Sequence, residues 1–430
     1  MVGGAVRDLY LGFTPRDYDF LVEDPKKEAE AAAQALGLDV FALREGVMRA
    51  QGRGLVLDFA PLPEGGLFAD LCRRDYTVNA LAMNRRGAVF GLKRGLMDLK
   101  ARRLRALARE NLEADPVRAF RAVRLWVTRG LRPEPRTWSW IREEARRIRF
   151  RPPPMERIAE EFRQILGHPR AAFGVQKLKE SGLLAVFLPE LATGAGVAQG
   201  GYHHLDVLGH EIEALFELLC RFPEAGLDLR FATLVHDVAK PLVRQWDETR
   251  GYYRFFHHDE DGAALARTLA RRLGFGREDR RRIEAWVRAH MRLPPESAKG
   301  FLRWLFKYRT LLPELLMLQI SDRAASRGPL SDPEEAHWLT QRLDAARRRL
   351  AQLPTRPRLD GRELMALTGR SGGPWIEQLK ALLLKAEWEG KVSSYEEAKD
   401  FVKSWHEAEA AAARDPRNAG GLPPQRPHGD

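Results

Sequence analysis

The sequence predicts a mixed α and β domain at the N-terminus, followed by a long all-α region. Within the first hundred residues, short strand-like runs alternate with turn residues. Beyond Arg109, apolar residues recur at helical spacing. The chain of 430 residues is 44% hydrophobic and 30% charged, which suits several packed cores and argues against a largely disordered protein.

The N-terminal elements follow one another in a clear order. A strand is expected first, and then Asp24 and Pro25 provide an N-cap and a first-turn proline for a helix that Gly37 ends. Further strands are expected in two hairpins, whose turns are Gly52-Arg-Gly54 and Arg85-Arg86-Gly87. The predicted strands cover residues 17–22, 39–44, 47–51, 55–60, 80–83 and 88–92.

The remaining chain is predicted to be helical. A helix over 116–126 brings Arg118, Arg121 and Arg124 into one neighbourhood, because they are three residues apart. Segments rich in Pro and Gly near 130–136, 152–154 and 194–201 are candidate joints. Residues 203–326 and 333–411 are expected to be helical, and residues 412–430 to form a disordered tail.

Composition narrows the class of protein. Lys and Arg exceed Asp and Glu by 71 to 59, and the net charge of +12 favours a polyanionic partner, nucleic acid first. Two cysteines are too few for a disulfide scaffold. No apolar run is long enough for a membrane span, and no secretory signal is evident, so we expect a cytoplasmic protein without a membrane partner.

A first group of polar residues lies near the N-terminus. Gly3 and Gly4 precede a helical start, where backbone N–H groups can approach a phosphate. Asp17 and Asp19 are two apart on a strand and therefore point to the same face. Neighbouring carboxylates repel unless a cation lies between them, and Mg²⁺ binds such carboxylates together with substrate phosphates. The group therefore suits phosphoryl transfer.

These residues belong to an ordered series of motifs. Gly3-Gly4-Ala-Val-Arg7-Asp8 and Asp17-Tyr-Asp19 are followed by Arg73-Arg74-Asp75-Tyr-Thr-Val-Asn79, Gly95-Leu-Met-Asp98 and Asp115-Pro-Val-Arg118. The series resembles the class II tRNA nucleotidyltransferase and bacterial poly(A) polymerase family over about residues 2–170. The resemblance implies a palm-like α+β nucleotidyltransferase domain at 1–108 and an all-α neck and body at 109–194.

The resemblance also implies roles for individual residues. Asp17 and Asp19 would be catalytic and hold Mg²⁺. Asp115 and Arg118 would read the base, because a carboxylate accepts from the cytosine amino group and an arginine donates to cytosine O2 and N3 or to adenine N1. Asp58 is either a third active-site carboxylate or a strand-end acid without a catalytic role. The further nucleotide-binding residues are Gly3, Gly4, Arg7, Arg73, Arg74, Asp75, Asn79, Arg121 and Arg124.

The choice of nucleotide depends on one short segment. Between Asp19 and Arg73 the chain is shorter than in typical CCA-adding relatives, at the place of a loop thought to let the site switch from CTP to ATP. The resemblance therefore favours addition of CC from CTP to tRNA, with a separate A-adding enzyme as a partner. Full CCA addition, which would also use ATP, and poly(A) synthesis remain alternatives.

A second group of motifs spans the middle of the chain. Its blocks are His203-His204, His236-Asp237, His257-His258, His290 and Asp322, spaced along expected helices. The series resembles the HD phosphohydrolase superfamily and implies an all-α HD domain at 195–330, followed by a helical tail domain at 331–411. His203, His236, Asp237 and Asp322 would bind a transition metal such as Ni²⁺ or Mn²⁺, while His258 and His290 would hold a second metal or steady a phosphate. Lys240 would help to bind phosphate, and His210 is interpreted as an ordinary polar residue with satisfied hydrogen bonds.

Two competing interpretations assign the chain to other classes. One is an RNA-binding HD phosphohydrolase with an inactive transferase domain, and the other is a binding module without a bound nucleotide. Asp17, Asp19, Arg73, Arg74 and Asp75 are all present, which argues against the first. Both metal constellations argue against the second.

Overall fold

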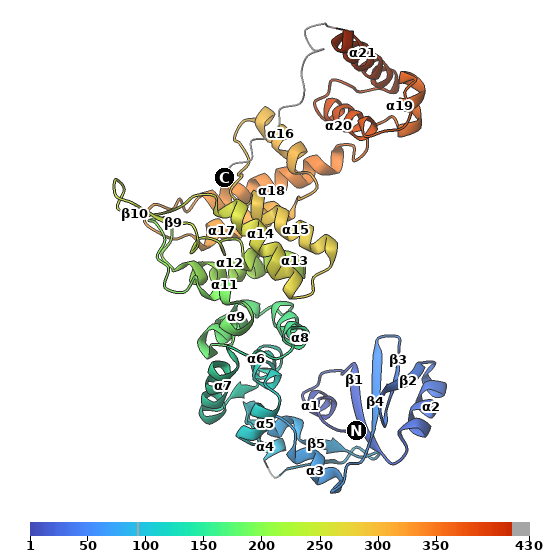
Figure 1. Ribbon diagram of the computed structural model, residues 1–430, viewed down its shortest axis with the longest axis vertical. Helices are drawn as coiled ribbons and strands as arrows, with labels where there is room; N and C mark the ends of the chain where they lie inside the picture. Colours follow the sequence, from blue (N-terminus) through green and yellow to red (C-terminus); the bar gives the residue numbers. More distant parts are fainter. Residues whose placement is uncertain (93, 415–430) are drawn as a thin grey trace. The chain divides into compact units, whose positions relative to one another are not determined.

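The computed structural model describes residues 1–92 and 94–414 (Figure 1). The expected α+β region followed by helices is confirmed. The N-terminal elements are α1 (Gly4–Tyr10), β1 (Asp17–Val22), α2 (Pro25–Leu36), β2 (Asp39–Arg44), β3 (Val47–Gly52), β4 (Leu55–Pro61), α3 (Gly66–Cys72), the short 3-10 helix η1 (Thr77–Asn79), β5 (Leu81–Met83), β6 (Val89–Gly91), α4 (Gly95–Lys100) and β7 (Arg103–Leu104).

A four-stranded sheet with the order β1-β4-β3-β2 carries the N-terminal domain. Helix α2 begins at the Asp24 cap, whose side chain accepts from Lys27 N, and ends at Gly37 in the left-handed conformation. Its buried alanines pack against Ala50 and Phe59 of the sheet, together with Tyr18 and Phe20 of β1. Because side chains alternate along a strand, Asp17 and Asp19 lie on the opposite face of β1.

The first residues join the sheet to α1. Val2 N donates to Asp19 O and Gly3 N donates to Leu81 O, both at 2.8 Å. Gly3 has φ 79°, and a Cβ there would lie 2.3 Å from the Arg74 guanidinium. A side chain would be strained at this positive φ, so glycine suits the position, which seats the start of α1 beside Asp19.

The neck and body are helical and include two short strands. Helix α6 packs against α8 and α9, and Phe120, Phe162 and Phe187 form its aromatic core, with ring centroids 5.0 to 5.7 Å apart. The elements are α5 (Arg109–Ala114), α6 (Val117–Arg129), β8 (Arg132–Pro133), α7 (Pro135–Ile148), α8 (Met155–Leu166), α9 (Ala171–Ser181), α10 (Leu184–Phe187) and α11 (Pro189–Ala192).

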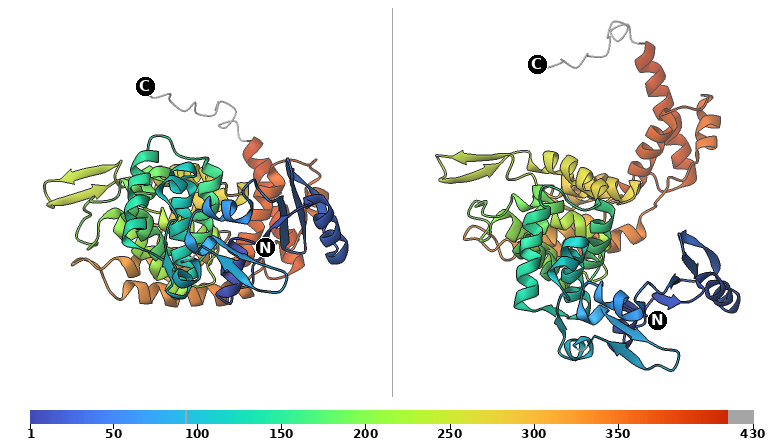
Figure 2. Two further views of the ribbon diagram at one scale, coloured as in Figure 1. Left: turned by 90° about the horizontal axis from the view of Figure 1, so that it is seen from below. Right: turned by 60° about the horizontal axis from the view of Figure 1, so that its bottom comes forward.

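The next region is largely helical, but the prediction of helix throughout 203–326 is wrong at 244–255. There the chain forms an antiparallel hairpin, which extends from the helices in Figures 1 and 2. Trp246 precedes a turn at Gly251, and Tyr252, Tyr253 and Phe255 follow it; such aromatic residues around a Gly turn favour a hairpin. The elements are α12 (Val207–Arg221), α13 (Leu227–Leu234), β9 (Arg244–Asp247), β10 (Tyr252–Phe255), α14 (His258–Arg272), α15 (Arg277–Ala289), α16 (Ala298–Tyr308) and α17 (Glu314–Ala325).

The chain divides into two compact units. One comprises residues 1–291 and 318–333, and the other comprises 292–317 and the described residues from 334 onward. Residues 292–317 therefore group with the C-terminal helices, whereas the sequence assigned them to the HD domain. The second unit has its own core around Leu379 and Leu383. Its other helices are α18 (Glu335–Gln352), α19 (Gly361–Thr368), α20 (Trp375–Trp388) and α21 (Tyr395–Arg414).

Two expectations concern the rest of the chain. Residues 412–414, expected in a disordered tail, lie in α21, and the remainder of that expected tail, 415–430, is outside the described residues. Among the described helices, none has both the length and the apolar character of a membrane span.

Candidate functional site

A polar cavity of about 430 Å³ lies between the N-terminal sheet and helix α6. It brings together most of the nucleotide-binding residues expected from the sequence, including both carboxylates of β1. Gly3, Arg73 and Asp115 are not in its lining. Arg73 is exposed and donates to Ala69 O. The lining residues are Gly4, Arg7, Asp17, Asp19, Arg74, Asp75, Asn79, Arg118, Arg121, Arg124 and Glu161.

The floor of this cavity is negatively charged. Asp19 keeps contact with solvent, yet partial burial raises the pKa of its carboxyl, with Asp58 and Asp17 adding to the rise and Arg74 opposing it. Asp58 pairs with Asp19 in the register of β1 and β4, but both of its oxygens accept from Arg49, at 2.7 and 2.8 Å. The open carboxylates are therefore Asp17 and Asp19, a pair that fits a divalent cation.

Asp75 organises one wall of the cavity from inside the protein. Its oxygens accept from Asn79 Nδ2 at 2.8 Å and from Arg121 at 2.9 Å. Burial opposes ionisation, but Arg121 and the hydrogen bonds hold the pKa of Asp75 below its usual value. Asn79 in turn accepts from Arg7 at 2.5 Å. In this arrangement Asp75 positions Arg121 and Asn79, rather than offering a free carboxylate to a nucleotide.

The three arginines of α6 face the cavity together, as their spacing predicts. Arg121 and Arg124 both donate to Glu161 of α8, which helps to fix their direction. Arg118 donates to Asn111 O at 2.8 Å, and its Nε has no hydrogen-bond partner among the described residues.

The other half of the expected base-reading pair lies at the rim. Asp115 accepts two hydrogen bonds from Arg157 of α8, at 2.9 and 2.7 Å, and its carboxylate is 3.8 Å from Arg118 Nε. Arg157 and Glu161 lie outside the set of site residues expected from the sequence. Packing of α8 on α6 brings Glu161 to the cavity and Arg157 to Asp115.

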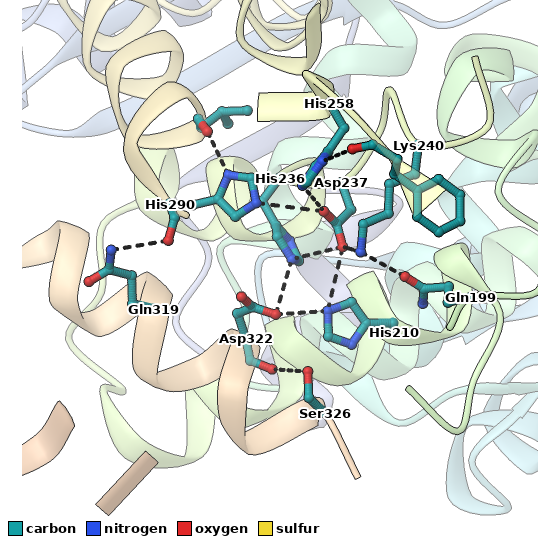
Figure 3. A network of polar contacts seen from close by, with 12 residues as sticks. Gln199, His210, His236, Asp237, Lys240, His258, His290, Gln319, Asp322 and Ser326 are labelled. Atoms are coloured by element: carbon teal, nitrogen blue, oxygen red, sulfur yellow. Dashed lines mark hydrogen bonds and ion pairs between the residues drawn. The ribbon is translucent and has the colours of Figure 1, made fainter. Parts of the chain in front are cut away.

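A second polar centre lies among the helices of residues 203–326 (Figure 3). Three histidines share one local arrangement, in which Nδ1 contacts the backbone carbonyl three residues earlier at 2.6 to 2.9 Å. Because a carbonyl oxygen can only accept, each Nδ1 carries the proton. The Nε2 atoms of His236, His258 and His290 are left with lone pairs that point into the centre.

These nitrogens face acceptors, not donors. His236 and His258 Nε2 lie 3.4 Å from Asp237 oxygens, and His290 Nε2 lies 3.6 Å away. None of the three has a hydrogen-bond partner among the described residues. Lone pairs that face carboxylates in a buried site repel one another unless a cation lies between them. The residues present therefore fit a divalent metal.

The candidate ligands form two clusters. His210, His236 and Asp322 make the first, and Asp237, His258 and His290 make the second. Within each, the ligand atoms lie within 4.8 Å of one another. Lys240 Nζ contacts Asp237 Oδ2 at 2.6 Å. Burial opposes the ionised form, but Lys240 and the imidazoles hold the pKa of Asp237 well below its usual range.

The structure differs from the sequence-based expectation at two histidines. His210, interpreted as an ordinary polar residue, is fully buried and contacts Asp322 Oδ1 at 3.0 Å. His203, expected as a ligand, lies outside both clusters, with its ring 4.3 Å from that of His210. His210 points inward because it follows the Asp206 cap by one helical turn, a placement that the motif spacing alone does not reveal.

Comparisons with known proteins match three parts of the chain. Three family models match: the poly A polymerase head domain at 59–105, a probable RNA and SrmB-binding site of polymerase A at 130–194, and the HD domain at 203–326. The chain belongs to the tRNA nucleotidyltransferase and poly(A) polymerase family, and it is a nucleotidyltransferase with an HD domain.

Individual relatives make the family assignment more specific. The chain is 43% identical to a CC-adding tRNA nucleotidyltransferase of Thermus thermophilus, over 96% of both chains. It is 41% identical to an A-adding tRNA nucleotidyltransferase of Deinococcus radiodurans, over 95% of both. Its fold is similar to the crystal structure of the Bacillus stearothermophilus CCA-adding enzyme in complex with CTP, at 22% identity, a TM-score of 0.63 and coverage of 96% of this chain and 94% of that chain.

Proposed function

We propose that this protein adds CMP residues to the 3′ end of tRNA, using CTP and Mg²⁺. The observation that carries the proposal is the cavity that joins Asp17 and Asp19 to the arginines of α6. Asp17 and Asp19 would hold the magnesium ions, which neutralise the triphosphate and the developing charge. Arg74, beside Asp19, would contact the phosphates. The similarity to CC-adding and A-adding tRNA enzymes supports tRNA as the acceptor.

Base selection would rest on Arg118 and Asp115. An arginine that donates and a carboxylate that accepts are complementary to cytosine. Uracil offers the opposite pattern at the same edge and is rejected. For Asp115 to take part, its two hydrogen bonds with Arg157 have to be shared or exchanged when the nucleotide binds.

We infer CC addition in particular from the short connection after β4. Only residues 62–65 separate β4 from α3, which leads directly to Arg73. A site without a long loop at this place has less means of rearranging from CTP to ATP. The product would then end in CC, and a separate A-adding enzyme would complete it. The alternatives are addition of all three nucleotides and poly(A) synthesis.

Product length separates these activities. A tRNA that ends at the discriminator base is incubated with CTP, with ATP and with both, and the products are resolved on a sequencing gel. We expect two added residues with CTP and little further extension when ATP is present. Asp17→Ala and Asp19→Ala should abolish addition. Efficient AMP addition to a tRNA ending in CC would overturn the CC assignment, and a ladder of adenylates would indicate a poly(A) polymerase.

We propose a second activity for the HD centre, hydrolysis of phosphomonoesters or cyclic phosphodiesters such as 2′,3′-cyclic phosphates at RNA ends. The unpartnered Nε2 atoms of the three histidines carry this proposal. A bound Ni²⁺ or Mn²⁺ would supply Lewis acidity toward a phosphoryl oxygen. Lys240, held by Asp237 and Gln199, would orient the phosphate. Such hydrolysis would clear damaged 3′ ends before nucleotide addition.

Metal analysis tests this second activity. Protein purified without chelator should contain a transition metal and should hydrolyse a nucleoside 2′,3′-cyclic phosphate. Absence of metal, together with no hydrolysis under added Ni²⁺, Mn²⁺ or Mg²⁺, would leave the helices as a scaffold for tRNA.

A further inference from the structure

The hairpin of β9 and β10 presents an unusual face. Because Tyr253 pairs with Trp246 and Phe255 with Arg244, these four side chains lie on one face of the two-stranded sheet. Gln245, Asp247, Tyr252 and Arg254 occupy the other face. We call the first set, together with Lys240 at the root of the hairpin, the aromatic strip.

Aromatic rings and cations alternate along this strip. The rings of Trp246 and Tyr253 are 4.9 Å apart, and the Arg244 guanidinium lies 3.5 Å from the centroid of Tyr253. Farther along, Lys240 Nζ lies 5.5 Å from the ring of Phe255. The same Nζ contacts Asp237 at 2.6 Å. The strip thus leads from the exposed hairpin to the HD centre without interruption.

The root of the hairpin is fixed to that centre on two sides. The carbonyl of Phe255 accepts from Nδ1 of His258, one of the candidate ligands, at 2.7 Å. Tyr252 packs so closely on Gly200 that a Cβ there would lie 3.0 Å from its ring. Gln199, beside Gly200, accepts from Lys240 at 2.7 Å. The hairpin is therefore a positioned extension of the site.

The composition of the hairpin fits a single-stranded polyanion. Trp246 is 54% exposed. The exposure of a large apolar indole to water is unfavourable unless a ligand stacks on the ring. Residues 240–257 carry Lys240 and three arginines against only two acids, Asp247 and Glu248. Exposed aromatic rings beside arginines form the stacking platforms of proteins that bind unpaired nucleotides, while the cations attract the phosphates.

We propose that the aromatic strip binds the last unpaired nucleotides of an RNA and directs its terminal phosphate to the HD centre. This inference rests on the proposed phosphohydrolase function and gives that site its substrate class, single-stranded RNA 3′ ends. A strand rises roughly 3.3 Å per residue, so Trp246 and Arg244 are about 7 Å apart, the length of two stacked bases. The strip should therefore recognise about two nucleotides next to the terminal phosphate.

Binding of short oligoribonucleotides tests the strip directly. The probes are fluorescently labelled RNAs of one to five nucleotides that end in a 3′-phosphate, and the full chain is titrated against each by anisotropy without added metal. Stacking on one aromatic ring is worth about 5- to 150-fold in affinity. We expect affinity to rise up to about two nucleotides and to change little beyond that length. Trp246→Ala should weaken the trinucleotide at least five-fold, and Trp246→Phe should restore most of the loss.

Two variants serve as matched controls. Gln245→Ala removes a side chain from the opposite face of the same strand, and Leu242→Ala removes an apolar side chain that is 72% exposed but lies outside the strip. Both should bind the trinucleotide as the unmodified protein does. RNA bound in the transferase cavity contributes equally to all five proteins and cancels in the comparison.

The outcomes separate a failure of the proposed RNA binding by the strip from a failure of the proposed hydrolysis at the HD centre. If the affinity of Trp246→Ala for the trinucleotide is within two-fold of that of the unmodified protein, the proposed RNA binding by the strip is wrong. This conclusion holds whether or not the HD centre hydrolyses phosphoesters. If RNA binding falls while no phosphoester is hydrolysed, the strip stands and the proposed hydrolase fails. An altered oligomeric mass in sedimentation with unaltered RNA affinity would identify the hairpin as a contact between copies of the chain and overturn the proposal.

Discussion

Arg118 is the side chain of the transferase cavity with the clearest donor still available. One of its nitrogens is bound by Asn111 O, and its buried Nε has no hydrogen-bond partner among the described residues. A buried donor without a partner costs free energy, which a nucleotide base would recover on binding. The geometry therefore agrees with the base-reading role expected from the sequence, although that role stays a prediction.

Substitution of Arg118 tests this role. In Arg118→Ala, misincorporation of UTP relative to CTP should rise about ten-fold or more, because a lost bidentate contact costs about 1–3 kcal/mol of discrimination. Arg142→Ala, at an exposed arginine of α7, is the control and should keep normal selectivity. Single-nucleotide incorporation rates with each NTP give the ratio. Unchanged selectivity in Arg118→Ala would exclude it from the base-reading site.

The ionisation of the buried Asp75 should make the free energy of unfolding depend on pH. Its folded-state pKa is lowered by Arg121, so its ionised form stabilises the folded protein above the unfolded pKa of about 3.9, and this contribution is lost as pH falls through the folded pKa. Asp75→Asn should lower the free energy of unfolding by about 2 kcal/mol at pH 7, since it removes one of the two buried carboxylates that accept from Arg121, the other being Glu161. The difference from the unmodified protein should shrink as pH falls below 3.9, as measured by urea denaturation at several pH values. A difference independent of pH would contradict the assignment.

Among the elements, the segment before α12 and the segment after α17 are held together by a close contact between their backbones. Gly328 N donates to Tyr202 O, and Leu330 N donates to Gly201 O, both at 3.0 Å. A Cβ at Gly328 would lie 2.2 Å from Gly201 O and 2.6 Å from His203 N, so the two backbones could not keep this distance. The glycine thereby brings the start of the HD region against the helix that carries Asp322.

Gly328→Ala should consequently separate these two segments. Overpacking of this kind costs about 1–3 kcal/mol, and we expect a lower free energy of unfolding together with weaker retention of metal. Chemical denaturation and metal content after dialysis measure the two effects. Gly372→Ala provides the control, because the nearest atom to its added Cβ would be Met365 Sδ at 3.8 Å. Equal stability of both variants would show that the backbones can move apart freely.

At the scale of the whole molecule, the two centres draw on different parts of the chain. The transferase cavity is lined by residues between Gly4 and Glu161, whereas the metal clusters use residues between His210 and Asp322. No residue is common to the two sets. Each centre should therefore respond to substitution without the other.

Asp237→Ala tests this independence. It removes a carboxylate that three histidines and Lys240 face, so hydrolysis and metal content should be lost. Addition of CMP to tRNA should continue at nearly the normal rate, and Asp19→Ala should show the reverse pattern. Parallel assays of both activities on the same preparations measure this. Loss of nucleotide addition in a folded Asp237→Ala protein would reveal coupling between the centres.

Features that depend on local rules could be predicted from the sequence. The alternation of strand side chains placed Asp17 and Asp19 on one face, Asp24 and Gly37 bounded α2, and helical spacing aligned the arginines of α6. These are consequences of periods of two and 3.6 residues and of capping, which act within a few residues.

Contacts between residues that are distant in the sequence follow from the packing of the folded chain. In the folded protein Arg49 donates to the Asp58 carboxylate, and α8 brings Glu161 and Arg157 close to α6. The candidate metal cluster contains His210 and not the expected His203. The packing also places the aromatic face of β9 and β10 beside the HD centre, where the sequence predicted helix. Each of these contacts joins segments whose meeting is set by the packing of whole elements, and no local periodicity specifies that packing.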